Sequence, residues 1–356
     1  MAELPWAHPA AEWPFGRADL TAGLRRHLDD TSLQVEDVRP LTLRQRQPAI
    51  GRIRGLQVEY QARDGDGEVR LVLKEPHGST RAGLAGAGRR EVGFYRSLAE
   101  HVPLPTPDLV AFSPVGDWLI LEYLDHVHSP DRWSREDYIN AIDSLAELHD
   151  RFWSLRVDLE AFPWLGDPLA SDFDVHLAAA DKAIERITKA AGPEPLAGLP
   201  GRRWILERLA EEAERVVAPL RAESSTLLHG DFWPGNVAQS ENGRQTVYDW
   251  QLAGIGPGIM DLLVFVNKSE WWYRPLPISR SEMVGRYRDQ LEARGITWED
   301  ETWSVLWDHA LMWRFVQEWF DLLAASPLPV LATRAEQLDQ VWLQPVEDAL
   351  NRRLGG

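Results

Sequence analysis

The chain of 356 residues contains no cysteine and no long apolar run. Without cysteine, disulfides, thiolate chemistry and cysteine-based zinc sites are excluded. No stretch of 18 or more apolar residues occurs, so the sequence predicts no transmembrane helix and no membrane partner. The first 17 residues lack a basic segment followed by a continuous apolar one, which is not the pattern of a secretory signal. We therefore expect a cytoplasmic protein.

Basic residues are in the minority. The chain has 38 Lys and Arg against 55 Asp and Glu, a net charge of −17, which argues against general nucleic-acid binding. The charge is unevenly spread, because residues 39–96 carry 12 basic and 6 acidic side chains whereas residues 299–356 carry 4 and 10. This unevenness either is ordinary variation between solvated faces or indicates that one end handles an anion and the other attracts a cation.

The first third of the chain is rich in strand signals. Residues 56–62 alternate apolar and polar, and a Gly- and Asp-rich turn separates them from a second strand at residues 69–74, which predicts a hairpin. A helix is expected over residues 89–100, and the apolar run at residues 118–124 predicts a buried strand.

The remainder is dominated by helical patterns. Ser134 and Asp137 have the spacing of a capping box at the start of one helix. Further helices are expected over residues 173–190, 202–220, 281–294, 299–325 and 334–353, with short strands at 226–228 and 246–248 and a loop at 254–258. We therefore predict two domains, residues 1–124 with an N-terminal extension and a helical part from residue 125 to 356.

One motif carries most of the chemical information. His229-Gly230-Asp231 is followed by Asn236, five residues after the aspartate, and by Asp249, thirteen residues later. In phosphoryl transfer one carboxylate orients the attacking hydroxyl, while an amide oxygen and a second carboxylate hold magnesium. The spacing therefore indicates a phosphoryl-transfer site.

These residues resemble the aminoglycoside phosphotransferase and choline kinase family, and the resemblance extends over nearly the whole chain. It implies an α+β, protein-kinase-like fold of two lobes, with a small antiparallel sheet in the N-terminal lobe and a larger helical C-terminal lobe. It also implies a kinase that uses ATP or GTP with Mg²⁺, in which Asp231 is the catalytic base and Asn236 and Asp249 bind the metal. Gly230 stands where protein kinases have arginine, so a small-molecule acceptor is expected.

The same resemblance requires a strand lysine that contacts the nucleotide phosphates and a helix glutamate that positions it. Lys74, at the end of a predicted strand, and Glu91, at the start of a predicted helix, fit these roles. The alternative is a surface lysine and a solvated glutamate. Glu75 is a competing partner by position, but alternation places it on the opposite face of the strand.

Two further segments match the nucleotide-binding lobe. Gly51 and Gly55 flank residues that lie where a phosphate-covering loop is expected, although a plain hairpin turn fits almost as well. Glu122, Tyr123 and Leu124 match the segment that joins the lobes and binds adenine through its main chain.

Three residues are interpreted as structural support for the catalytic loop. His149 and His229 are expected to be satisfied scaffold histidines, and Asp261 is expected to begin a helix and brace the loop. Trp250-Gln251 replaces the Phe-Gly of protein kinases, so no flipping activation switch is expected.

The acceptor is expected to lie against the helical part. Trp271 and Trp272 combine with Glu318 and Asp321 as aromatic faces and carboxylates, which suit a cationic ligand; the alternative is that the tryptophans, 17 in the chain, are core residues. The predicted acceptor is an aminoglycoside, amino sugar or amino alcohol, and the protein a monomer or homodimer. Two alternatives are a nucleotide-binding protein of the same fold without turnover and, ranked last, a metal-dependent phosphohydrolase.

Overall fold

A computed structural model of the chain describes residues 13–43, 51–76, 84–125, 127–189, 196–240 and 243–355. The chain divides into two compact units, and each is described by itself. The first takes in the described parts of Met1–Ser79, Gly86–Ala99 and Thr106–Asp125, and the second consists mainly of His126–Gly356. We keep the division after Leu124 as a proposal for the domain boundary.

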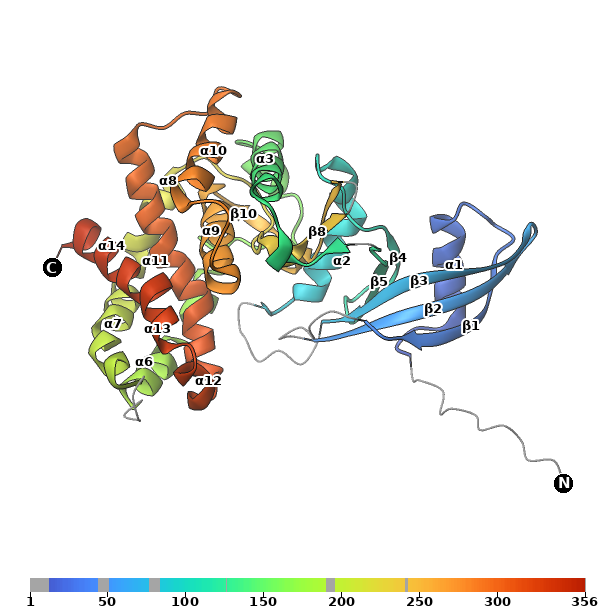
Figure 1. The fold of residues 1–356 in the computed structure, drawn as a ribbon, viewed down its shortest axis with the longest axis horizontal. Coiled ribbons are helices and arrows are strands. Elements are labelled where there is room, and N and C mark those ends of the chain that lie inside the picture. Colours follow the sequence, from blue (N-terminus) through green and yellow to red (C-terminus); the bar gives the residue numbers. More distant parts are fainter. Residues whose placement is uncertain are drawn as a thin grey trace. The chain divides into compact units, whose positions relative to one another are not determined.

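The first unit is built on a five-stranded antiparallel sheet of order β1-β2-β3-β5-β4 (Figure 1). The strands are β1 (Gln34–Leu41), β2 (Arg52–Ala62), β3 (Gly65–Glu75), β4 (Leu109–Phe112) and β5 (Leu119–Glu122). Strands β2 and β3 form the predicted hairpin, in which Ala62 pairs with Gly65 across a two-residue turn. Both strands are longer than their alternating segments indicated.

Helix α1 (Arg17–His27) covers one face of this sheet. Its Leu20 and Leu24 are fully buried with alternate residues of the central strands, among them Leu56 and Leu71. Neither α1 nor β1 was expected from the sequence. Helix α2 (Ala87–Ser97) overlaps the helix predicted over residues 89–100.

The loop conformation predicted for residues 51–55 is wrong for four of its five residues, while a role of Gly51 and Gly55 in nucleotide binding remains a proposal. Arg52 to Gly55 belong to β2, where Gly55 pairs with Leu41 on one side and Val72 on the other. Only Gly51, with φ of 74°, lies outside the strand. The connection between β1 and β2 therefore runs over residues 42–51, of which 44–50 lie outside the described residues. Gly55 lies within the strand because β1 approaches it closely: a Cβ there would lie 2.6 Å from the carbonyl oxygen of Leu41.

The second unit is mainly helical. Its strands are β6 (Val127–His128), β7 (Thr226–Leu228), β8 (Val237–Ser240), β9 (Gln245–Val247) and β10 (Gly254–Gly256). Its α-helices are α3 (Arg135–Arg151), α4 (Arg156–Leu159), α5 (Phe173–Leu177), α6 (Ala180–Thr188), α7 (Arg203–Glu211), α8 (Ala213–Ala222), α9 (Ile259–Tyr273), α10 (Arg280–Glu292), α11 (Asp300–Ala325), α12 (Leu328–Ala332), α13 (Ala335–Leu338) and α14 (Gln344–Leu354). The predicted α+β class is thereby confirmed.

Helix α11 is the central element of this unit, and it packs against α5, α6, α8, α9 and α14. Its Trp313, Phe315 and Phe320 are fully buried. The capping box predicted for α3 is confirmed, because Ser134 and Asp137 exchange backbone-to-side-chain hydrogen bonds. Among the described residues no helix is long and apolar enough to span a membrane.

Several predicted elements of the second unit differ in detail. The helices expected over 173–190 and 202–220 are each broken in two. The helix expected over 334–353 is interrupted by a π-helical turn at Asp339–Leu343. The loop expected at 254–258 is wrong for its first three residues, which form β10 and pair with β7. Glycine is needed there because a side chain on Gly254 would meet the carbonyl oxygen of Gly166 at 2.8 Å.

Candidate active site

The loop that carries the His-Gly-Asp motif follows directly from β7. Gly230 has φ of 79°, and a Cβ on it would lie 2.1 Å from the carbonyl oxygen of Leu252. Both the left-handed backbone and the close approach require glycine at this position. The loop is therefore folded tightly against the turn that follows Asp249.

Asp261, in the first turn of α9, braces this loop. Its carboxylate accepts the backbone N–H of His229 at 2.7 Å and that of Gly230 at 2.9 Å. His149 Nε2 lies 3.4 Å from the same carboxylate, and its Nδ1 lies 2.7 Å from the hydroxyl of Tyr287. Both His149 and Asp261 are fully buried. Structural support remains our proposal for their role.

His229 is held in one tautomer by its neighbours. Its Nδ1 accepts the backbone N–H of Asp231 at 3.2 Å, so its Nε2, 3.0 Å from the carbonyl oxygen of Tyr248, is the nitrogen that donates. Burial lowers the pKa of His229 and outweighs the nearby carboxylates that favour its charged form. The ring is therefore neutral and fully engaged, as a scaffold residue would be.

Asp231 projects into a cluster of charged side chains. Its Oδ1 accepts from Lys268 Nζ at 2.6 Å and from Arg314 Nη2 at 3.2 Å, and its Oδ2 accepts from Asn236 Nδ2 at 3.1 Å. Burial alone would raise the pKa of Asp231, but Lys268 and Arg314 outweigh it and lower the pKa to about 2. Asp231 is therefore an anion throughout the neutral range.

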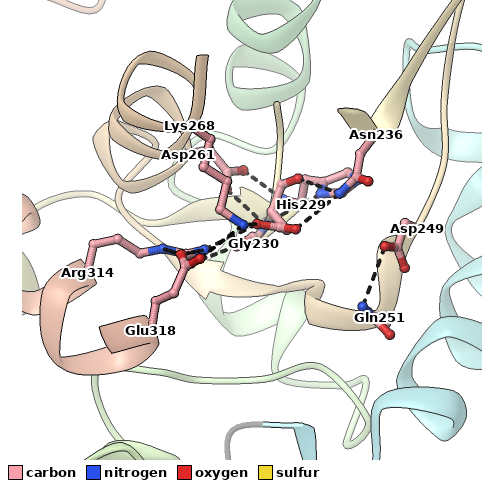
Figure 2. Close-up of polar contacts among 10 residues, drawn as sticks. His229, Gly230, Asn236, Asp249, Gln251, Asp261, Lys268, Arg314 and Glu318 are labelled. Atoms are coloured by element: carbon pink, nitrogen blue, oxygen red, sulfur yellow. Dashed lines mark hydrogen bonds and ion pairs between the residues drawn. The ribbon is translucent and has the colours of Figure 1, made fainter. Parts of the chain in front are cut away.

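Lys268 and Arg314 were not found from the sequence. Arg314 also donates to the carbonyl oxygen of Gly230 at 3.0 Å and to Glu318 at 2.8 Å, and Lys268 lies 3.3 Å from Glu318. Figure 2 shows Lys268, Arg314 and Glu318 converging on the loop at Gly230, with Asn236 and Asp249 on its other side. Two signals were present: the chain has only 4 lysines, and Lys268 follows Asp261 at helical spacing.

Asn236 and Asp249 have donor groups suited to a hard cation. The amide nitrogen of Asn236 donates to the main-chain and side-chain oxygens of Asp231. The Oδ1 atom of Asn236 is therefore the one that could bind a metal. Asp249 has a left-handed backbone, with φ of 68°, and its Oδ2 lies 3.5 Å from Gln251 Nε2. The described residues hold no group of three or more His, Asp or Glu suited to a metal. Two oxygens from the protein, completed by phosphate and water, fit magnesium.

In the first unit the structure brings Lys74 and Glu91 together. Lys74 Nζ lies 2.7 Å from Glu91 Oε2, and the glutamate is fully buried. Glu75, the competing partner, instead binds Arg54 at 2.8 Å on the other face of the strand. A contact of Lys74 with nucleotide phosphates remains a proposal.

The other residues predicted to bind nucleotide lie in or next to the sheet of the first unit. Glu122 ends β5, and its backbone N–H donates to the carbonyl oxygen of Asp108 at 3.0 Å. Main-chain recognition of a base would therefore use the carbonyl oxygen of Glu122 and the backbone of Tyr123 and Leu124. The ring of Tyr123 lies under the guanidinium of Arg70 at 5.1 Å. Gly55 is enclosed in the sheet and Gly51 lies at its end.

The predicted acceptor residues separate into two kinds. Trp271 is buried and packs edge-on against Trp319 at 5.0 Å, as a core residue does. Trp272 is 38% exposed, with the guanidinium of Arg334 4.4 Å from its ring centre. Asp321 is half-buried on α11. A contact of any of these with an acceptor remains a proposal.

A unit built on an antiparallel sheet and a mainly helical unit agree with a protein-kinase-like fold of two lobes. The profile of the phosphotransferase enzyme family (APH) matches residues 53–301, more than half of the chain. The chain therefore belongs to that family, and it is a small-molecule kinase.

Solved structures resemble this fold at low sequence identity. Amicoumacin kinase hAmiN, solved with AMP-PNP, Ca²⁺ and Ami, is 16% identical with a TM-score of 0.52, over 91% of this chain and 92% of that one. Choline kinase LicA from Streptococcus pneumoniae is 14% identical (TM-score 0.47; 94% and 97%). Aminoglycoside phosphotransferase APH(3'')-Id from Streptomyces rimosus is 16% identical (TM-score 0.47; 84% and 97%). Comparison with curated protein sequences gave no match.

Proposed function

We propose that the protein transfers the γ-phosphate of ATP or GTP to a hydroxyl group of a small polar molecule. The observation that carries this proposal is the environment of Asp231, whose Oδ2 is 3.1 Å from Asn236 Nδ2 while the amide oxygen faces away. The carboxylate of Asp231 and the amide of Asn236 thus lie side by side, so a metal held by the amide oxygen would lie close to a hydroxyl bound to Asp231, as phosphoryl transfer needs.

In this proposal Asp231 accepts a hydrogen bond from the acceptor hydroxyl and takes its proton late in the reaction. The hydroxyl oxygen forms the new bond to the γ-phosphorus, and the bond to the oxygen of the leaving nucleoside diphosphate breaks. Asn236 and Asp249 would hold Mg²⁺, which neutralises charge on the phosphates. Lys74, held by Glu91, would contact the phosphates, and residues 122–124 would bind the base.

The acceptor that we propose first is an amine-bearing one. Trp272 is 38% exposed and Asp321 is a half-buried carboxylate on a neighbouring helix, and an aromatic ring and a carboxylate are the groups that bind ammonium. Glu318, of the same predicted set, binds Arg314 and Lys268. That pairing favours a second candidate, an uncharged polyol or sugar.

A panel of acceptors tests the proposal. Purified protein with Mg²⁺ and either ATP or GTP is incubated with aminoglycosides, amino sugars, choline, nucleosides and neutral sugars, and products are identified by mass increase and ³¹P NMR. A phosphorylated hydroxyl is expected, and Asp249→Asn should raise the Mg²⁺ concentration needed for half-maximal rate. Nucleotide binding without product from any acceptor would instead favour the non-catalytic alternative.

A further inference from the structure

Lys268 is held at three points beside the proposed base. Its Nζ lies 2.6 Å from Asp231 Oδ1, 3.3 Å from Glu318 Oε1 and 5.4 Å from the centre of the Trp233 ring. The side chain is only 12% exposed. Fixing a lysine costs rotamer entropy, which these three contacts offset. Its head group is therefore a fixed part of the site.

The hydrogen bonds of Asp231 then show which of its oxygens is available. A carboxylate oxygen accepts about two hydrogen bonds. Oδ1 already accepts from Lys268 and from Arg314, whereas Oδ2 accepts only from Asn236 among the described residues. One acceptor position remains, and it belongs to Oδ2 on the side of Asn236.

We infer that Lys268, anchored by Glu318, is a positioning residue that fixes Oδ1 of Asp231, so that Oδ2 receives the acceptor hydroxyl beside the metal-binding amide. This inference rests on the proposed function of Asp231. It also gives Glu318 a role other than the substrate contact expected from the sequence: its carboxylate balances Lys268 and Arg314 and holds both in place.

Arg314 cannot replace Lys268 in this role. Its guanidinium is spread over Gly230, Asp231 and Glu318, and its contact with Asp231 is 3.2 Å against 2.6 Å for Lys268. Without Lys268 the Asp231 carboxylate would keep only the two longer contacts, 3.2 Å from Arg314 and 3.1 Å from Asn236, and would be held less firmly. Misplacement of a reacting group by about 1 Å lowers a rate by about 10²-fold.

The test separates kcat from KM in four variants. Lys268→Met should lower kcat by about 10²-fold with KM for nucleotide and acceptor within about threefold of wild type. Lys268→Arg, which keeps a charged donor, should have a kcat at least tenfold higher than that of Lys268→Met. Glu318→Gln should also lower kcat rather than raise the acceptor KM. Lys189→Met, at an exposed lysine that pairs with Glu185, is the matched control and should match wild type.

Three results would overturn the inference: Lys268→Met within threefold of wild-type kcat, an effect confined to acceptor KM, or no recovery with arginine. Thermal midpoints are measured for all variants, and Lys268→Arg and Glu318→Gln decide the question if Lys268→Met does not fold. Failure of the proposed function is a separate result, because the wild-type protein would then phosphorylate no acceptor.

Discussion

Asp261 and Lys268 stand seven residues apart on α9, and both bind the loop that carries the proposed base. Asp261 accepts the backbone N–H groups of His229 and Gly230, and Lys268 donates to the side chain of Asp231. Seven residues are about two helical turns, so the two side chains lie on one face of the helix, about 10 Å apart along it. A single helix therefore fixes both the backbone of the loop and the orientation of its carboxylate.

We expect Asp261→Asn to lower the free energy of unfolding by about 1–3 kcal/mol, because an amide cannot accept both backbone N–H groups without leaving a buried donor unpaired. The loop should also lose its position, so kcat should fall more than the stability change alone explains. Urea denaturation and steady-state kinetics measure the two effects. Asp289→Asn, an exposed aspartate of α10, is the control and should leave both unchanged.

Gly230→Ala should be far more damaging than Gly295→Ala. Both glycines have positive φ, 79° and 84°, so both substitutions carry the same kind of backbone cost. Only at Gly230 would the new Cβ meet another atom closely, the carbonyl oxygen of Leu252, since nothing lies within 4 Å at Gly295. The loss of unfolding free energy in Gly230→Ala minus that in Gly295→Ala therefore measures the cost of the contact with Leu252. Equal losses would show that the loop is not packed as described.

Lys74→Met should destabilise the first unit by about 3–5 kcal/mol, because Glu91 would then be a buried charge without its cation. Replacing both residues, as Lys74→Met with Glu91→Leu, should recover most of that loss but not nucleotide affinity. Thermal unfolding and nucleotide titration test this, with the exposed Lys182→Met as control. Full nucleotide affinity in the double variant would remove Lys74 from the proposed site.

Stability should fall as the pH drops below about 6.5. Burial lowers the pKa of both His229 and His309 below that ordinary value. Between the lowered values and about 6.5 the unfolded chain binds more protons than the folded one, so the free energy of unfolding rises with pH and is lost on acidification. Each histidine contributes at most about 1.4 kcal/mol per pH unit.

Urea denaturation at pH 7.5 and 5.5 measures this dependence. His309→Gln keeps a donor for the carbonyl oxygen of Val216, which His309 contacts at 2.8 Å, and should reduce the difference between the two pH values. His101→Gln, at an exposed position, should not. If His309→Gln shows the same difference in unfolding free energy between pH 7.5 and 5.5 as wild type, His309 does not contribute to the pH dependence.

The parts of the site that depend on local sequence could be predicted, and those that depend on distant contacts could not. Asp231, Asn236 and Asp249 lie within one short stretch, and the Lys74–Glu91 pair is what the family resemblance implies, with strand alternation setting Glu75 aside. Lys268 and Arg314 come from helices 37 and 83 residues beyond Asp231, so the local pattern around Asp231 does not indicate that they meet it; only the helical spacing of Lys268 from Asp261 points to the loop.

The fold shows the same division. The β2–β3 hairpin and the cap of α3 follow from adjacent residues and were predicted correctly. Strand β10 differs from the predicted loop because its pairing depends on a distant segment: Gly254 allows the close approach to Gly166. Helix α1 was missed because it is stabilised by burial against a sheet that forms elsewhere in the chain.

The most direct test of the account is the Asp231→Asn variant with an acceptor that the wild-type protein phosphorylates. The amide keeps the shape of the side chain but cannot take the proton of the hydroxyl. We expect kcat to fall by about 10²–10⁴-fold, the contribution of a positioned proton acceptor, while nucleotide affinity stays within about threefold. Turnover within tenfold of wild type would contradict the assignment of Asp231 as the catalytic base.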